Sequence, residues 1–298
     1  MKSSRRTRRS SSRTTFSAAV SKKGRARRKG SALRFRTEYQ GSSFSEFLAV
    51  DHPNQIPKFE LDSRGLAQLS IPHGTTVLAF KYEDGVMVAG DRLATEGHRV
   101  ASRDVKKVYP TDSHSLIAIA GAAGPCIEMA RLMRIELEHY EKIEGEALEL
   151  DGKANKLSQM IRANLPAAMQ GLVVVPLFAG YDLRRHSGRL WKFDVTGGRY
   201  EETEFEATGS GGLYARESLK KVHKNRVGLD GALSMAVEAL VDAADEDRAT
   251  GGIDVVRGIF PIINYCTAGG IEKVSDAKIE EIYRAIMADR SDDAGGAA

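Results

Sequence analysis

The chain has 298 residues, and its overall formal charge of +4 hides a sharp division. Residues 1–36 contain fourteen Lys and Arg residues and no acidic residue, whereas residues 75–298 contain 28 basic and 35 acidic residues. A surface for a polyanion would therefore belong to the first segment only. The two cysteines, Cys126 and Cys266, lie 140 positions apart, which excludes a metal-ligand spacing and a disulfide framework.

The sequence contains no signal that would direct it to a membrane. No apolar run reaches the roughly 18 residues that a membrane span requires. The Arg-rich start lacks the apolar segment of a secretory signal. A reduced, cytoplasmic location is therefore expected.

Residues 1–74 differ in composition from the rest of the chain. Residues 1–36 have too little apolar surface to form a core, so a solvated tail is predicted. A nucleic-acid-binding arm is the alternative, and the acidic charge of the following domain argues against it. Residues 43–48, Ser-Phe-Ser-Glu-Phe-Leu, form a short amphipathic patch that could dock on a partner.

From Thr75 onward, alternating strand and helix patterns predict an α/β domain. Strands are expected at residues 76–82, 86–89, 105–109, 115–120, 173–181, 190–193 and 200–206, with two more within 255–266. Helices are expected near residues 126–140, 153–169, 213–224, 229–244 and 279–286, the last after a cap at Ser275. The order is strands, two helices, strands, two helices, strands, helix. It favours two antiparallel sheets packed face to face with helices outside, a four-layer αββα sandwich.

The most informative pair of residues is Gly74-Thr75, at the junction between residues 1–74, which differ in composition, and the α/β domain. A cut between them would leave a free threonine, which carries a hydroxyl nucleophile and an amine base on one residue. Lys106 and Lys107 are adjacent in an otherwise apolar strand pattern, so one of them must face inward. Burial lowers the pKa of a lysine unless a carboxylate balances it, and Asp91 is available. A purely structural ion pair is the other interpretation.

Three further candidate residues, one glycine and two polar residues, lie at or near the ends of predicted elements. Gly121 follows a predicted strand, where its backbone N–H could face a reacting carbonyl. Ser210 lies in a Gly-Ser-Gly-Gly loop, and Asp247 begins the run Asp-Arg-Ala-Thr-Gly-Gly. Each is a weak signal alone, and neither glycine-rich loop has the spacing of a phosphate-binding P-loop.

Together these segments resemble the proteasome β-subunit family. They occur in the family's order and spacing, at residues 74–77 (GTTV), 88–92 (VAGDR), 105–108 (VKKV), 119–121 (IAG), 209–211 (GSG) and 247–252 (DRATGG). Residues 138–142, 167–171 and 257–261 resemble the actinobacterial branch, and residues 41–48 look like part of its propeptide. The resemblance covers about 70–288 and leaves out the basic residues 1–36.

This resemblance implies an N-terminal nucleophile hydrolase, a threonine endopeptidase. Residues 1–74 would be a propeptide removed by cleavage at Gly74–Thr75, and residues 75–298 the catalytic domain, with a flexible tail from about 290. Family roles carry over to Thr75 as nucleophile, Lys107 as electrostatic activator, Asp91 as its partner, the Gly121 N–H as oxyanion donor, and Ser210, Asp247 and Thr250 as supports for the Thr75 amine. Position 250 is often serine in the family.

By the same resemblance, the substrate site is formed by Ala94, Thr95, Val105, Ile119, Gly121 and Ala123. The apolar side chains in this set predict cleavage after hydrophobic residues. No cofactor or metal is expected. The implied partners are protein substrates, six further copies in a seven-membered β ring, α-subunit rings, an ATP-dependent unfoldase ring and a ubiquitin-like protein tag.

Two other classes of protein remain as alternatives. The simpler two-ring bacterial threonine protease shares the Thr-Thr start and the Gly-Asp pair, but its mature chain is shorter and it has almost no leader. A non-catalytic ring subunit would lack the set Thr75, Asp91 and Lys107. The mass of the assembled protein would discriminate, because loss of residues 1–74 indicates the self-activating class.

Overall fold

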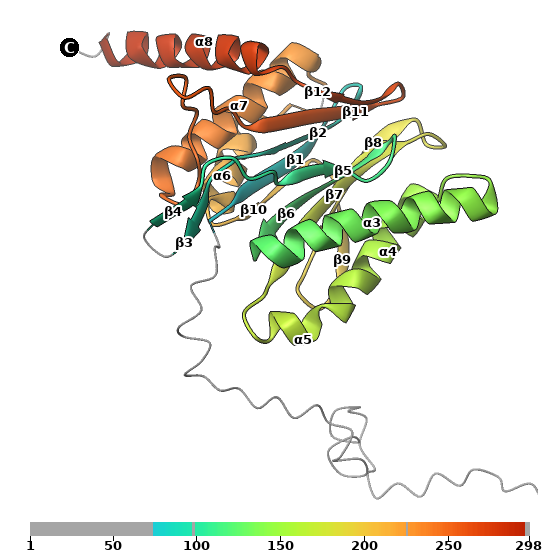
Figure 1. Ribbon diagram of the computed structural model, residues 1–298. Coiled ribbons are helices and arrows are strands. Elements are labelled where there is room, and N and C mark those ends of the chain that lie inside the picture. Colours follow the sequence, from blue (N-terminus) through green and yellow to red (C-terminus); the bar gives the residue numbers. More distant parts are fainter. Residues whose placement is uncertain (1–73, 97–98, 225, 296–298) are drawn as a thin grey trace, which may run out of the picture. The chain divides into compact units, whose positions relative to one another are not determined.

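The computed structural model describes residues 74–96, 99–224 and 226–295. They form two sheets lying face to face, with helices on both outer sides (Figure 1). The four-layer sandwich predicted from the sequence is confirmed. The predicted basic tail and the amphipathic patch at residues 43–48 lie outside the described residues.

The first sheet has the strand order β10-β1-β2-β11-β12. Its strands are β1 (Thr76–Tyr82), β2 (Gly85–Gly90), β10 (Phe205–Gly209), β11 (Ile262–Thr267) and β12 (Gly270–Lys273). All neighbours are antiparallel, and β1 lies between β2 and β10. A turn at Glu83 and Asp84 joins β1 to β2 as predicted.

The second sheet has the order β5-β6-β7-β8-β9 and is also antiparallel. Its strands are β5 (Val108–Pro110), β6 (Ser115–Gly121), β7 (Val174–Asp182), β8 (Ser187–Phe193) and β9 (Arg199–Glu202). A separate hairpin, β3 (Ala94–Glu96) with β4 (Arg99–Ser102), was not predicted.

Helices cover the outer face of each sheet (Figure 1). The first sheet carries α6 (Gly212–Val222) and α7 (Leu229–Glu246), with α8 (Asp276–Gly295) against α7. The second sheet carries α3 (Ala123–Glu144) and α4 (Leu150–Ala163), followed by the short α5 (Leu165–Ala168). The predicted cap of the last helix is confirmed, because Ser275 Oγ accepts a hydrogen bond from Lys278 N at 3.3 Å.

The strand sequences are apolar on both faces because both faces are covered. In β1, Leu78 and Phe80 pack under the helices of the first sheet, while Val77 and Ala79 face the second sheet. In β6, Ile117 and Ile119 pack under α3 and α4, and the alternate residues join the layer between the sheets. The period of two along a strand divides the core into three layers.

The single strand predicted over residues 200–206 is wrong, because the chain changes sheets there. β9 ends at Glu202, on the edge of the second sheet, and β10 begins at Phe205 and pairs with β1 of the first sheet. The strands predicted within 255–266 are also displaced. Residues 254–261 form a loop closed by a bridge between Asp254 and Ile259, and the hairpin of β11 and β12 follows.

Three elements differ in their bounds from the prediction. The helix predicted at 153–169 begins at Leu150 and ends at Ala163. Pro166 lies in the first turn of α5, where its missing N–H is tolerated. The strand predicted from residue 105 begins at Val108, and α8 stays helical to Gly295 where a tail was expected from about 290.

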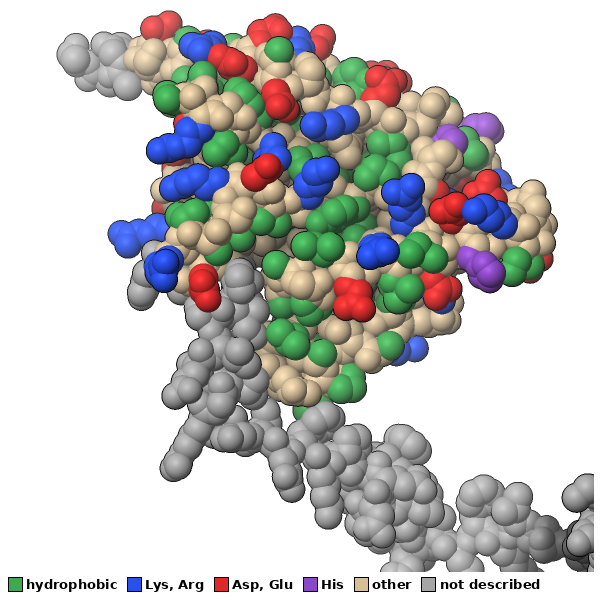
Figure 2. Space-filling model, in the orientation of Figure 1, with side chains coloured by type: hydrophobic (Ala, Val, Ile, Leu, Met, Phe, Trp, Pro, Cys, Tyr) green, Lys and Arg blue, Asp and Glu red, His purple; other side chains and the backbone are tan. Residues whose placement is uncertain are grey.

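The face of the molecule seen in Figure 2 mixes charged side chains with exposed apolar ones. On α3 the aliphatic side chains that are 45–65% exposed are Ile127, Leu132, Ile135 and Ile143. Among the described residues, no helix is both long and apolar enough to cross a membrane.

Candidate active site

The candidate site lies where the ends of three neighbouring strands meet. Thr75 directly precedes β1, Asp91 directly follows β2, and Ser210 directly follows β10. Because β1 lies between β2 and β10 and is antiparallel to both, these three residues come to the same edge of the sheet.

The other predicted residues come from the second sheet and from α7. Lys107 directly precedes β5, and Gly121 ends β6. Asp247 is the C-cap of α7, and Thr250 follows three residues later. Six of the seven predicted catalytic residues are joined by hydrogen bonds through Gly74 and Thr75, and Gly121 lines the same pocket as Thr75.

Asp91 and Lys107 form a buried ion pair. Lys107 Nζ donates to Asp91 Oδ1 and to Leu93 O, both at 2.6 Å. The side chains are 4% and 0% exposed, and Lys106 beside them is exposed. The prediction that one of the adjacent lysines faces inward is thus confirmed, although the strand itself begins one residue later.

Backbone N–H groups hold the Asp91 carboxylate in place. Oδ1 accepts from Thr76 N at 2.8 Å, and Oδ2 accepts from Leu93 N at 2.9 Å and Gly251 N at 2.8 Å. Desolvation lowers the pKa of Lys107, while the attraction of Asp91 opposes that effect. The result is a fixed ammonium group that loses its proton more readily than an exposed lysine.

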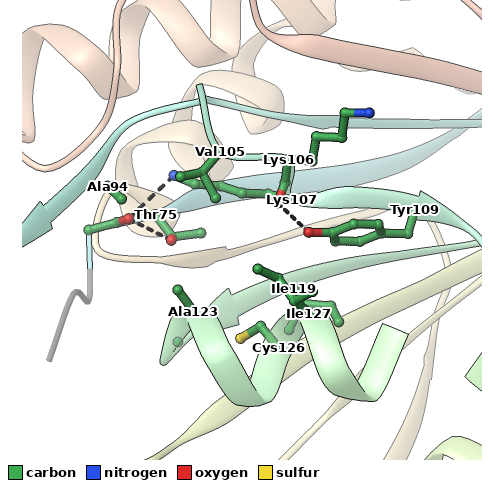
Figure 3. A pocket seen from close by; sticks show the side chains of 12 residues that line it. Thr75, Ala94, Val105, Lys106, Lys107, Tyr109, Ile119, Ala123, Cys126 and Ile127 are labelled. Atoms are coloured by element: carbon green, nitrogen blue, oxygen red, sulfur yellow. Dashed lines mark hydrogen bonds between the residues drawn. The ribbon is translucent and has the colours of Figure 1, made fainter. Parts of the chain in front are cut away.

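The peptide between Gly74 and Thr75 lies within reach of this ammonium group. Thr75 Oγ1 donates to Gly74 O at 2.6 Å, and Lys107 Nζ donates to the same oxygen at 3.3 Å (Figure 3). Thr75 is 5% exposed. The hydroxyl group and the cation therefore converge on one carbonyl group, the one that the sequence marked as the cleavage site.

On the other side of Thr75, polar side chains surround its nitrogen. Thr75 N donates to Ser210 Oγ at 3.3 Å, and Ser210 N donates to Thr75 O at 2.8 Å. Asp247 Oδ2 accepts from Ser210 Oγ at 2.5 Å and from Thr250 Oγ1 at 2.6 Å. The methyl group that distinguishes Thr250 from serine does not prevent this contact.

A small pocket opens beside Thr75. Five of the six predicted substrate-site residues line it, namely Ala94, Val105, Ile119, Gly121 and Ala123. Thr95 is not among the lining residues. Its side chain lies instead against Gly74, where an added Cβ would come within 2.5 Å of Thr95 Oγ1.

Four residues that line this pocket were not predicted from the sequence: Lys106, Tyr109, Cys126 and Ile127 (Figure 3). The sequence placed Cys126 only at the start of the helix expected near residues 126–140, and the structure shows that the first turns of α3 also form a pocket wall. Burial raises the pKa of Cys126 to about 12, so this thiol contributes an apolar wall and not a nucleophile.

Gly121 has a backbone conformation that other residues rarely adopt, with φ at +127°. A Cβ at this position would lie 2.1 Å from Val173 O. Glycine is therefore required at the end of β6, next to the pocket. Within residues 74–96, 99–224 and 226–295, no group of three His, Cys, Asp or Glu side chains could hold a metal ion.

Comparison with known proteins gives one consistent family. Residues 71–257 match the model of the proteasome subunit family. The chain is similar to "Proteasome subunit beta" of Streptomyces griseus subsp. griseus, with 49% identity over 259 residues that cover 86% of this chain and 91% of that protein. It is 52% identical to the protein of the same name from Acidimicrobium ferrooxidans over 244 residues, covering 81% and 88% of the two chains. The corresponding protein of Acidothermus cellulolyticus is 48% identical over 260 residues, covering 86% and 89%.

Proposed function

Because the chain belongs to the proteasome subunit family, we propose that it is the catalytic β subunit of a proteasome core particle, activated by cleaving its own Gly74–Thr75 bond. The chain is a threonine-type peptidase. The observation that carries the proposal is the convergence of Thr75 Oγ1 and Lys107 Nζ on the Gly74 carbonyl oxygen, at 2.6 and 3.3 Å.

Activation begins with attack of Thr75 Oγ on the carbonyl carbon of Gly74. Lys107 polarises that carbonyl group through its contact with the oxygen. The carbon–nitrogen bond then breaks, the nitrogen of Thr75 takes up the proton lost by the hydroxyl, and an ester links Gly74 to Thr75. Water hydrolyses the ester, which releases residues 1–74 with a carboxylate at Gly74 and leaves a free hydroxyl and a free amine on Thr75.

The same residue then hydrolyses peptides. In the uncut chain, the Thr75 nitrogen is an amide and cannot act as a base, so the precursor is inactive. A free α-amine has a pKa of about 7.7–8.0, and the nearby charge of Lys107 lowers it further, so a useful fraction is neutral near pH 7. This amine accepts the proton of the Thr75 hydroxyl, through a water molecule, and returns a proton to the leaving amine of the substrate.

The remaining residues of the site hold the reacting groups in position. Asp91 orients Lys107, whose charge lowers the effective pKa of the Thr75 hydroxyl. The Gly121 N–H donates to the oxyanion of the acyl-transfer intermediate. Ser210, Asp247 and Thr250 orient the Thr75 amine. The side chain of the substrate before the scissile bond enters the pocket beside Thr75, whose apolar walls favour hydrophobic residues.

The family and the surface both support assembly into rings. The described residues carry exposed apolar side chains on α3 and other helices, which is typical of surfaces that contact other subunits. We propose a seven-membered ring of this chain stacked on rings of α subunits, which encloses the active sites. Unfolded or tagged proteins would enter through an ATP-dependent unfoldase ring that recognises a ubiquitin-like tag, in the cytoplasm.

Self-cleavage is tested by replacing the attacking group in the full-length chain, expressed with its α subunit. Thr75→Ala is expected to accumulate the uncut chain of 298 residues, because no hydroxyl remains to attack Gly74. Thr75→Ser is the matched control, because it keeps the hydroxyl and should still lose residues 1–74. Intact mass of the purified particles reads out both results. A processed N-terminus at residue 75 in Thr75→Ala, without wild-type subunits or added protease, would rule out self-cleavage.

A further inference from the structure

The proposed mechanism leaves the hydroxyl group of Thr76 without a role, although this side chain is fully buried beside the site. Thr76 touches both halves of the hydrogen-bond network. Its backbone N donates to Asp91 Oδ1 at 2.8 Å, and its Oγ1 lies 2.5 Å from Thr250 Oγ1. Its Oγ1 also accepts a hydrogen bond from Gly211 N at 3.1 Å.

The direction of each hydrogen bond in this network follows from counting protons. The carboxylate of Asp247 can only accept, so Thr250 must use its one proton to donate to Asp247 Oδ2. Thr250 therefore accepts in the contact with Thr76, and the Thr76 hydroxyl must be the donor. The contact with Gly211 agrees with this direction. Gly211 N donates to Thr76 Oγ1, so the proton of the Thr76 hydroxyl stays available for Thr250.

The second branch reaches Asp247 from the side of the nucleophile. Ser210 Oγ has one proton and two acceptors in range, Thr75 O at 3.2 Å and Asp247 Oδ2 at 2.5 Å. The shorter contact with the charged group takes the proton, so Ser210 accepts from Thr75 N and donates to Asp247. Two directed chains thus meet at Asp247: one from Thr75 through Ser210, and one from Gly211 through Thr76 and Thr250.

We infer that Thr76 is a positioning residue for catalysis, which sets the basicity of the Thr75 amine by holding the Thr250 hydroxyl in its donating orientation toward Asp247. The inference rests on the proposed function, in which that amine is the base. The charged groups that face the amine are Lys107 with Asp91 on one side and Asp247, through Ser210, on the other.

Removing the Thr76 hydroxyl has a predictable direction of effect. Thr250 would lose the donor that fixes its orientation, and Asp247 would lose part of the hydrogen bonding that disperses its negative charge. The stronger negative potential at Thr75 favours the protonated amine, so the pKa of the amine rises. Catalysis then needs a higher pH.

The test uses Thr76→Val, which keeps the shape of the side chain, in the full-length chain assembled with its α subunit. Hydrolysis of a fluorogenic peptide is measured against pH and divided by the number of processed subunits, counted by intact mass. We expect the acid limb of kcat to move up by about half a pH unit, which lowers kcat by up to about threefold at pH values below the pKa of the amine. KM should stay within about twofold of wild type, because Thr76 does not line the pocket. Thr76→Ser keeps a hydroxyl at this position and should show the wild-type acid limb of kcat.

Two further variants separate this role from a structural one. Thr111→Val removes another buried threonine hydroxyl, bonded to Ser115 outside the site, and should leave the pH profile unchanged. If Thr76 acts through Thr250, the double variant Thr76→Val/Thr250→Val should be no slower than Thr250→Val alone. Where a variant is not processed, residues 75–298 are expressed behind a removable fusion, so that the Thr75 amine is exposed, and kcat is compared in the same way.

A wild-type acid limb in processed Thr76→Val particles would overturn the inference, as would a double variant whose loss equals the product of the two single losses. Neither result touches the proposed function, which fails only if Thr75→Ala particles are processed or active.

Discussion

Replacing Lys107 by alanine removes three hydrogen bonds from the centre of the site. The ammonium group donates to Asp91 Oδ1 and Leu93 O at 2.6 Å and to Gly74 O at 3.3 Å. Losing one partner of a buried ion pair costs about 3–5 kcal/mol of folding free energy. Asp91 keeps its three backbone N–H donors, so we expect a loss near the lower end, about 3 kcal/mol.

The effect on peptide hydrolysis should be larger than the effect on stability. Removing a charge that stabilises the reacting groups costs about a hundredfold or more in kcat. Lys107→Arg keeps the charge but places a broad planar group where a compact ammonium group meets three acceptors. We therefore expect both variants to be nearly inactive, with the arginine variant the better folded.

The assay must separate catalysis from processing, because Lys107 also contacts the scissile carbonyl group. Residues 75–298 are expressed behind a removable fusion, so that Thr75 is exposed without self-cleavage, and are assembled with the α subunit. Stability is read from chemical denaturation, and activity from a fluorogenic peptide. If Lys107→Ala particles assemble normally and hydrolyse the peptide at near the wild-type rate, the assigned role is wrong and the pair with Asp91 is structural.

The wild-type enzyme should also show the titration of Lys107. Burial lowers the pKa of this group below its ordinary value of 10.5, so its charge is present at low pH and lost as pH rises through the lowered value. The descending alkaline limb of kcat should therefore lie below pH 10.5. Arginine keeps its proton throughout that range, so the residual activity of Lys107→Arg should lack this alkaline limb. If the limb is unchanged in that variant, the assignment to Lys107 is wrong.

Three further predictions concern other parts of the molecule. Gly74→Ala should slow self-cleavage at least tenfold, measured by intact mass over time, because an added Cβ would lie 2.5 Å from Thr95 Oγ1 and 2.7 Å from Ala249 O. A panel of fluorogenic peptides should show fastest cleavage after hydrophobic residues, and fastest turnover after an acidic residue would contradict the apolar pocket. Arg189→Met should lower the free energy of unfolding by about 1–3 kcal/mol without reducing kcat, because this buried side chain binds three carboxylates on other elements, of which two are 44% and 40% exposed. Lys142→Ala, in an exposed pair, is the control and should change stability by less than about 0.5 kcal/mol.

Local sequence patterns were sufficient for most elements of the fold. The strand at Thr76–Tyr82 and the turn that follows it have clear signals, since period-two alternation and a glycine after two acidic residues are local features. The pattern could not show where the chain leaves one sheet for the other. Residues 199–209 are extended on both sides of that crossing, and only the pairing of β10 with β1 places them in different sheets.

The residues of the candidate site were likewise only partly recognisable from local sequence patterns. Thr75 was recognisable from its place at the junction between residues 1–74 and the domain, and Asp91 from its charge at the end of an apolar strand. The pattern showed that one of the adjacent lysines faces inward, and the family resemblance implied the role of Lys107. Tyr109, Cys126 and Ile127 fit their local patterns well, so nothing marked them as pocket walls. The role inferred for Thr76 depends on the direction of a hydrogen bond to a residue 174 positions away, which no local signal contains.

The sequence distance between Thr75 and its supports also orders events during synthesis. Thr75 N is bonded to a side chain 135 residues further along, and Asp91 to a backbone group 160 residues further along. The ribosome makes the nucleophile early and the groups that orient it near the end. Under the proposed mechanism, we expect a growing chain, or one truncated before Asp247, to hold an inactive threonine, because the groups that orient its amine are not yet made.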